Sequence, residues 1–179
     1  MKKNYRKLTT EELDRISLHD YESSQKLPIV LVLDNVRSAN NVGSMFRTSD
    51  AFLIECIYLC GITATPPNKD IQKTALGAQL SVPWKYAEST VELILQLQKE
   101  GYTIISIEQV EGSTLLQDFT CKPNTKYAII FGNEVSGVSD EVVSHSDECI
   151  EIPQFGTKHS FNVSVTCGIV LWELTKGFL

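Results

Sequence analysis

Three segments of the chain combine glycines with amide, hydroxyl and charged side chains, a combination that can bind a ligand or hold a reacting group. The first, residues 34–50, places Asn41 and Gly43 at the start of an expected helix and Arg47 further along it. Helix N-termini present free N–H groups to anions, and an arginine adds a planar set of donors that matches phosphate. The segment is therefore either an anion site or an asparagine-capped helix whose arginine faces solvent.

The second segment, residues 129–139, runs from an apolar strand directly into Gly132 and then into a loop that contains Glu134 and Gly137. A glycine at the end of a strand lets a ligand approach the backbone. The glycine spacing matches neither the dinucleotide fingerprint nor a phosphate-binding loop with its lysine. Taken alone, the segment is better explained by a tight turn with two glycines and an exposed glutamate.

The third segment, residues 150–164, runs from the end of a strand to Ser160 and Asn162, which open an apolar helix. Either residue is a sufficient N-cap for that helix. His159 could be a general base, but a single histidine in a loop more often faces solvent. None of the three segments identifies a function by itself.

Apolar runs and helical patterns alternate around these segments, which predicts strands and helices in turn. Strands are expected at residues 28–33, 54–59, 103–107, 127–131 and 149–152. Helices are expected at 42–52, from Ser89 or Thr90 to Lys99, from Ser139 or Asp140 to about His145, and at 162–176, with a loop and a short helix between 62 and 88.

This alternation indicates an α/β domain with a mainly parallel sheet layered between helices, in which ligands bind beyond the carboxyl ends of the strands. The last helix is apolar nearly all round, so we expect a core or a partner subunit to bury it. At the N-terminus, Thr9 followed by Glu12 forms a capping box and predicts another helix. That helix would make residues 1–26 an extension packed on one main domain, residues 27–179.

The composition argues against several classes of protein. The net charge of −6 disfavours a generic nucleic-acid binder, although Lys2, Lys3, Arg6 and Lys7 can form a local basic patch. The five cysteines include no CxxC pair and the three histidines are far apart, so we expect neither a disulfide framework nor a zinc site. No apolar run approaches the roughly 18 residues of a membrane span, and no signal peptide is apparent, so we expect a cytoplasmic protein that does not enter the membrane.

In order and content, the three segments resemble the three motifs of the SpoU/TrmH family of RNA ribose methyltransferases, over residues 28–176. The matching residues are Asn41, Gly43, Arg47 and Thr48, then Gly132, Glu134 and Gly137, and finally Ile152, Pro153, Gly156 and residues 160–164. One departure is Phe161, which stands where the family usually has leucine.

The resemblance implies a deep C-terminal trefoil knot, an exception to the rule against threaded chains. It also implies that S-adenosylmethionine binds in the knot, mostly to backbone groups of the second and third loops. A homodimer would form through the C-terminal helix and the knot region. The expected cofactor-binding residues are Gly132, Asn133, Ile152, Phe161, Asn162 and Val163, with Ser106 as a weaker candidate.

The reaction that the resemblance implies is methylation of a ribose 2′-hydroxyl in RNA. We hypothesise that Arg47 holds a phosphate beside the target ribose and helps to activate the hydroxyl, with Asn41 in support. Ser160 and Asn162 would shape the loop around cofactor and target, and Glu134 would orient Arg47 or the cofactor site. The arginine would position and polarise rather than act as a base, because its pKa is above about 12.

For the substrate, similarity to compact family members favours tRNA over ribosomal RNA. Without the separate substrate-binding domain of many members, RNA would bind to the N-terminal helix, the knot face and the partner subunit. One alternative is a non-catalytic RNA-binding or assembly module of the same fold. Another is a methyltransferase of this fold that acts on a protein or a small molecule, which the negative charge would suit. A nicotinamide enzyme is more distant, because no dinucleotide fingerprint follows any strand.

Overall fold

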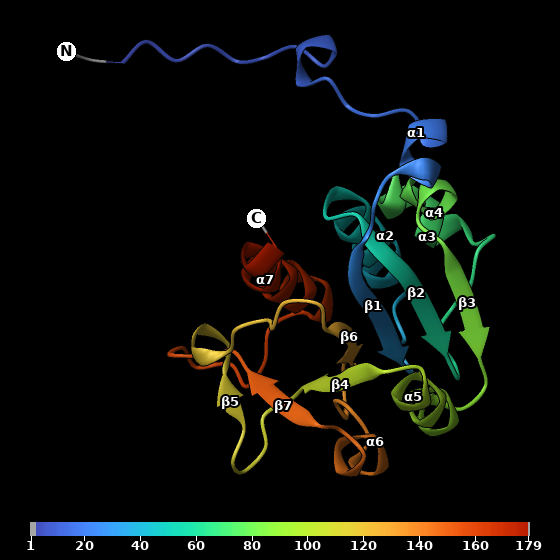
Figure 1. The fold of residues 1–179 in the computed structure, drawn as a ribbon, viewed down its shortest axis with the longest axis vertical. Helices are drawn as coiled ribbons and strands as arrows, with labels where there is room; N and C mark the ends of the chain where they lie inside the picture. Colours follow the sequence, from blue (N-terminus) through green and yellow to red (C-terminus); the bar gives the residue numbers. More distant parts are fainter. Residues whose placement is uncertain (1–2, 179) are drawn as a thin grey trace.

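The computed structural model describes residues 3–178, which form one parallel sheet between two layers of helices, with an N-terminal extension that projects from the body (Figure 1). Its seven strands are β1 (Leu27–Asp34), β2 (Ile54–Cys60), β3 (Trp84–Ala87), β4 (Tyr102–Ile107), β5 (Thr114–Leu115), β6 (Lys126–Phe131) and β7 (Glu148–Glu151). They lie in the order β3-β2-β1-β6-β4-β7-β5, and every neighbouring pair is parallel.

The five predicted strands are all present within two residues of their expected ends. The two strands that the sequence pattern missed, β3 and β5, are the edges of the sheet. Each pairs on one side only, and β3 leaves Lys85 and Tyr86 exposed. Short edge strands of this kind carry no continuous apolar run, which is why periodicity does not reveal them.

The helices are α1 (Leu18–Ser23), α2 (Ala39–Ala51), α3 (Lys69–Ala75), α4 (Ala78–Ser81), α5 (Thr90–Lys99), α6 (Asp140–Ser144) and α7 (Val163–Thr175), with short 3₁₀ helices at Glu11–Leu13, Leu116–Asp118 and Lys176–Phe178. Helix α2 begins three residues earlier than expected. Its N-cap is Ser38, whose side chain accepts a hydrogen bond from the Asn41 N–H. The side chain of Asn41 is therefore free for other contacts.

The strands bury both of their faces, and the alternation of side chains separates two cores. In β1, Leu31 and Leu33 face one core, which includes residues of α2, α3, α4 and α7. Val30 and Val32 face the other, which includes residues of α5 and α6. Because each face is covered, the apolar runs read as continuous rather than alternating. The loops at the carboxyl ends of the strands remain accessible between the two layers.

The prediction of an N-terminal helix from the Thr9–Glu12 capping box is wrong in its position. The Thr9 N–H does donate to Glu12, at 2.8 Å, but the same carboxylate also pairs with Arg6. Only a 3₁₀ turn follows, and the next helix, α1, begins at Leu18 with Ser17 as its cap. The apolar side chains that a longer helix would have to bury, Leu13, Ile16 and Leu18, are all exposed, and a short helix without a packed face is marginal.

Helix α7 is buried on one side only. Cys167, Val170 and Leu171 lie in the core, whereas Val165 and Trp172 are 51% and 56% exposed. The core therefore covers one face of this helix and leaves apolar side chains exposed on the other. In the part of the chain that the structure describes, no helix is both long and apolar enough to cross a membrane.

Candidate active site

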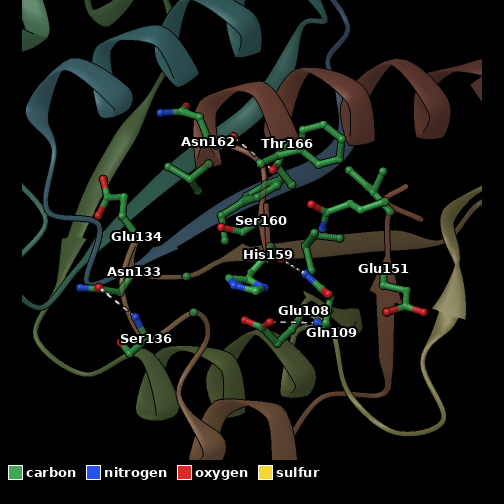
Figure 2. A pocket seen from close by; sticks show the side chains of 18 of the residues that line it. Glu108, Gln109, Asn133, Glu134, Ser136, Glu151, His159, Ser160, Asn162 and Thr166 are labelled. Atoms are coloured by element: carbon green, nitrogen blue, oxygen red, sulfur yellow. Dashed lines mark hydrogen bonds between the residues drawn. The ribbon is translucent and has the colours of Figure 1, made fainter. Parts of the chain in front are cut away.

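A cavity of about 530 Å³ opens beyond the carboxyl ends of β4, β6 and β7. Its walls are two loops: the β6–α6 loop, residues 132–139, and the β7–α7 loop, residues 152–162. Figure 2 shows residues of the β6–α6 loop on one side and His159 and Ser160 of the β7–α7 loop opposite them, with Glu108 and Gln109 of the β4 end below. The second and third motifs therefore meet at one site, as expected for parallel strands with adjacent carboxyl ends.

The first motif joins this site through one hydrogen-bonded chain of side chains. Asn41 Nδ2 donates to Glu134 Oε1 at 2.9 Å, and Asn162 Nδ2 donates to Asn41 Oδ1 at 3.1 Å. Glu134 also accepts the backbone N–H groups of Arg37 and Ser38, at 2.8 and 3.0 Å. One residue from each motif thus takes part in a continuous network, which fixes the start of α2 against both cavity loops.

The charge of Glu134 is stabilised by this network. Burial by itself would raise the pKa of its carboxyl group, but the hydrogen bonds from the Arg37 N–H, the Asn41 amide and the Ser38 N–H outweigh it and lower the pKa below the ordinary value of 4.5. Glu134 was expected to orient Arg47 or the cofactor site. Among the described residues, its side-chain partner is Asn41, and Arg47 is not one of its partners.

The β6–α6 loop closes tightly on itself. Asn133 and Gly137 exchange backbone hydrogen bonds of 2.9 Å in both directions, and Asn133 Nδ2 donates to the Asn35 carbonyl at 2.8 Å. A Cβ atom on Gly132 would lie 2.1 Å from Gly137 C and Val138 N. The space beside Gly132 is therefore taken by its own loop rather than by a ligand, so this glycine serves the turn.

The glycine of the first motif has a comparable role. A Cβ atom on Gly43 would lie 2.1 Å from Thr74 Oγ1 and 2.4 Å from the Ile71 carbonyl oxygen. Gly43 is thus the point at which α2 and α3 pack backbone to backbone. This packing orients α2, which carries Asn41 into the network and Arg47 onto the surface.

The structure brings eight of the eleven predicted site residues into the cavity wall: Gly132, Asn133, Glu134, Ile152, Ser160, Phe161, Asn162 and Val163. Asn41 is not in the wall but contacts two residues that are. Arg47 is exposed and lies six residues beyond Asn41, about 9 Å along the helix and about a third of a turn around it. Ser106 is fully buried and its hydroxyl is paired with that of Ser146 at 2.7 Å, so its side chain faces the protein interior.

Several residues in the cavity wall were not singled out from the sequence, notably Glu108, Gln109, Gln154 and Thr166. Glu108 and Gln109 directly follow β4, so the rule that ligands bind beyond strand ends would have found them. His159, expected to face solvent, is exposed but lies in the cavity wall (Figure 2). The charged residues of the wall are Glu108, Glu134 and Glu151, and no lysine or arginine is among the lining residues.

Comparison with known proteins places these features in one family. The model of the SpoU rRNA Methylase family matches residues 28–172. A 23S rRNA (guanosine-2′-O-)-methyltransferase, RlmB of Neisseria meningitidis serogroup B, is 30% identical over 155 residues, which are 87% of this chain and 61% of that protein. The chain therefore spans about three fifths of the length of this relative.

Solved structures agree on the fold. An AdoMet-bound rRNA methyltransferase from Sinorhizobium meliloti superposes with a TM-score of 0.79 at 26% identity, covering 87% of this chain and 58% of that one. A TrmH/SpoU tRNA modifying enzyme from A. aeolicus also superposes with a TM-score of 0.79, at 24% identity, covering 89% of this chain and 81% of that one. Because the family model matches most of this chain and all three motif segments meet at one cavity, the chain belongs to the SpoU methylase family.

Proposed function

We propose that this chain transfers the methyl group of S-adenosylmethionine to a ribose 2′-hydroxyl of RNA. The observation that carries the proposal is the network from Glu134 through Asn41 to Asn162, which joins all three motifs beside the cavity. Relatives named as AdoMet-bound and as guanosine-2′-O-methyltransferases support the cofactor and the ribose hydroxyl as the methyl acceptor.

The cavity fits S-adenosylmethionine in size and charge. Its volume of about 530 Å³ lies within the range of small-molecule sites. Apolar side chains of the wall such as Ile152 and Val163 can contact an adenine ring, and the loop backbones offer N–H and carbonyl groups. The absence of lysine and arginine from the wall disfavours a cofactor with a diphosphate, whereas carboxylates suit a cationic sulfonium. When bound, the cofactor supplies an activated methyl group.

We assign the residues of the chain as follows. Asn162, held by Asn41, would fix the third-motif loop around the cofactor, and Ser160 would face the target ribose from that loop. Arg47, exposed on α2, would bind the RNA phosphate beside the target and polarise the hydroxyl. Positioning of this kind can contribute several powers of ten to the rate, because the reacting groups are held in line before the reaction.

The sequence relatives favour one class of RNA substrate. RlmB of Neisseria meningitidis is named for 23S rRNA, so ribosomal RNA is the first substrate to test. Similarity to compact family members that methylate tRNA makes tRNA the second substrate to test. Residues 27–179 would form the catalytic domain, and the extension before them would contribute Lys3 and Lys7 to RNA binding.

The family also leads us to propose a trefoil knot around the cavity. The sheet order supports it: the chain passes from β4 out to β5, returns to β6 on the other side of β4, crosses again to β7, and ends in α7, which packs on α2. A single-molecule extension experiment on the denatured chain, pulled from both ends, would give a contour length shorter than that of a free chain if the knot is present.

A homodimer is supported by the outer face of α7. Val165, Trp172 and Phe161 are each more than 40% exposed and lie on or beside one helix. Exposed apolar side chains grouped in this way mark an interface. A second copy related by a two-fold axis would bury this face on both subunits at once.

The direct experiment is transfer of labelled methyl from S-adenosylmethionine to ribosomal RNA and tRNA that lack the modification. Wild type is compared with Arg47→Ala and, as a control for loss of a surface cation, with Lys99→Ala, since Lys99 is exposed at the end of α5 and is not among the residues that line the cavity. We expect alkali-resistant label in ribosomal RNA with wild type and the control, and a loss of at least about 100-fold with Arg47→Ala. Cofactor binding with transfer to neither RNA would favour a protein or small-molecule substrate, and full activity of Arg47→Ala would refute the role of the arginine.

A further inference from the structure

The end of β4 holds both walls of the cavity through two consecutive side chains. Glu108 Oε2 accepts the Val138 N–H of the β6–α6 loop at 2.8 Å, and Glu108 Oε1 accepts the N–H of Gln109 at 2.8 Å. Gln109 Nε2 then donates to the His159 carbonyl of the β7–α7 loop at 2.9 Å. Each loop therefore has one hydrogen bond to the same dipeptide, which lies beneath His159 and Ser160 in Figure 2.

The β6–α6 loop is shaped to admit this carboxylate. A Cβ atom on Gly137 would lie 2.1 Å from Glu108 Oε2, and Gly137 has a φ of +70°, which favours glycine. The second glycine of the motif thus accommodates Glu108, just as Gly132 accommodates the return of the loop. A side chain at Gly137 would push the loop away from Glu108, and one at Gly132 would push apart the two ends of the loop.

We propose that Glu108 and Gln109 are positioning residues that fix the width of the cofactor cavity by binding one loop each. They act through the two loops that line the cavity. The inference rests on the proposed function, because it assigns the cavity to S-adenosylmethionine. A cavity held open in its binding geometry binds its ligand more tightly, since less conformational entropy is lost on binding.

Substitutions at the two positions should weaken the binding of S-adenosylmethionine to different extents. Gln109 is exposed, so Gln109→Ala removes one hydrogen bond without disturbing the core. We expect the dissociation constant for S-adenosylmethionine to rise about three- to tenfold, the equivalent of one neutral hydrogen bond. Glu108→Ala removes the acceptor of the Val138 N–H and should have a larger effect, whereas Glu108→Gln keeps one acceptor oxygen and should fall between wild type and Glu108→Ala.

The experiment combines calorimetric titration of S-adenosylmethionine with hydrogen exchange of the ligand-free protein, read by mass spectrometry. Gln109→Ala should speed exchange in residues 153–162, and Glu108→Ala in residues 132–139, while exchange in α5 stays unchanged. Gln96→Ala is the matched control, because Gln96 is an exposed glutamine on α5 that donates to Glu100 at 2.8 Å, away from the cavity. It should leave both the affinity and the loop exchange as in wild type.

The outcomes separate the positioning role from the proposed function. If wild type does not bind S-adenosylmethionine, the proposed function fails, yet the exchange measurement still tests whether the dipeptide holds the loops. If wild type binds and both alanine variants bind within about twofold of it, the positioning role is refuted. Weaker binding without faster loop exchange would also refute it, because the residues would then act by direct contact.

Discussion

The network that joins the three motifs can be tested by a single isosteric change, Asn41→Asp. This replacement keeps an oxygen that can accept the Asn162 hydrogen bond but puts a carboxylate where Asn41 Nδ2 lies 2.9 Å from Glu134 Oε1. A charged hydrogen bond is lost and a repulsion between two anions is created. Because Glu134 is exposed, the appropriate dielectric constant is close to that of water.

At that dielectric constant, two unit charges at this separation repel by about 1.4 kcal/mol, and loss of the hydrogen bond adds about 1 kcal/mol. We therefore expect Asn41→Asp to lower the free energy of unfolding by about 2–3 kcal/mol near neutral pH. Asn41→Ala, which removes the hydrogen bonds without adding a charge, should lower it by about 1–2 kcal/mol.

The direction in which the stability difference between Asn41→Asp and wild type changes with pH is the sharpest test. In wild type the pKa of Glu134 is lower in the folded state than its ordinary value of 4.5. The contribution of Glu134 to the free energy of unfolding is therefore fully present above pH 4.5 and is lost as the pH falls through the lower, folded-state pKa. In Asn41→Asp the facing carboxylates raise the pKa of the pair, and protonation removes the repulsion. The stability gap between variant and wild type should therefore narrow as the pH falls.

Urea unfolding of the three proteins from about pH 7 to about pH 4 measures this gap. The reasoning is refuted if Asn41→Asp is no less stable than Asn41→Ala at neutral pH, or if its stability gap does not change with pH. Either result would mean that Asn41 and Glu134 are not in contact in solution.

Three further predictions concern the core and the surface. Gly43→Val should lower the free energy of unfolding measured in urea titrations by about 1–3 kcal/mol, because the valine side chain would enter the contact between α2 and α3. Unchanged stability would contradict that packing. Trp172→Glu should halve the mass measured by light scattering if α7 forms the dimer, whereas Glu173→Gln beside it should not. Burial raises the pKa of the Cys60 thiol to about 12, so iodoacetamide at neutral pH should label the half-buried Cys149 first and reach Cys60 only after unfolding.

The candidate site was predictable to the extent that its residues belong to motifs that resemble those of a known family. The cofactor-binding candidates at 132–133 and 152–163 lie in two loops that each follow a strand, and all of them line the cavity. Ser106 shows where this reasoning stops. It also lies near the end of a strand, but its hydroxyl pairs with that of Ser146, whereas the residues at and just beyond the end of β4, Ile107, Glu108 and Gln109, line the cavity.

The hydrophobic pattern of the chain determined its α/β class and five of its strands, because periodicity along a segment depends only on which faces that segment buries. The motifs likewise indicated the family from residue types and spacing. Only the tertiary structure decided which of these residues meet. Asn41 contacts Glu134 and Asn162 across 93 and 121 residues of sequence. These contacts form because β6 lies between β1 and β4, so that loops distant in sequence meet at the carboxyl ends of neighbouring strands. Strand order is set by the packing of the whole chain, and no local pattern contains it.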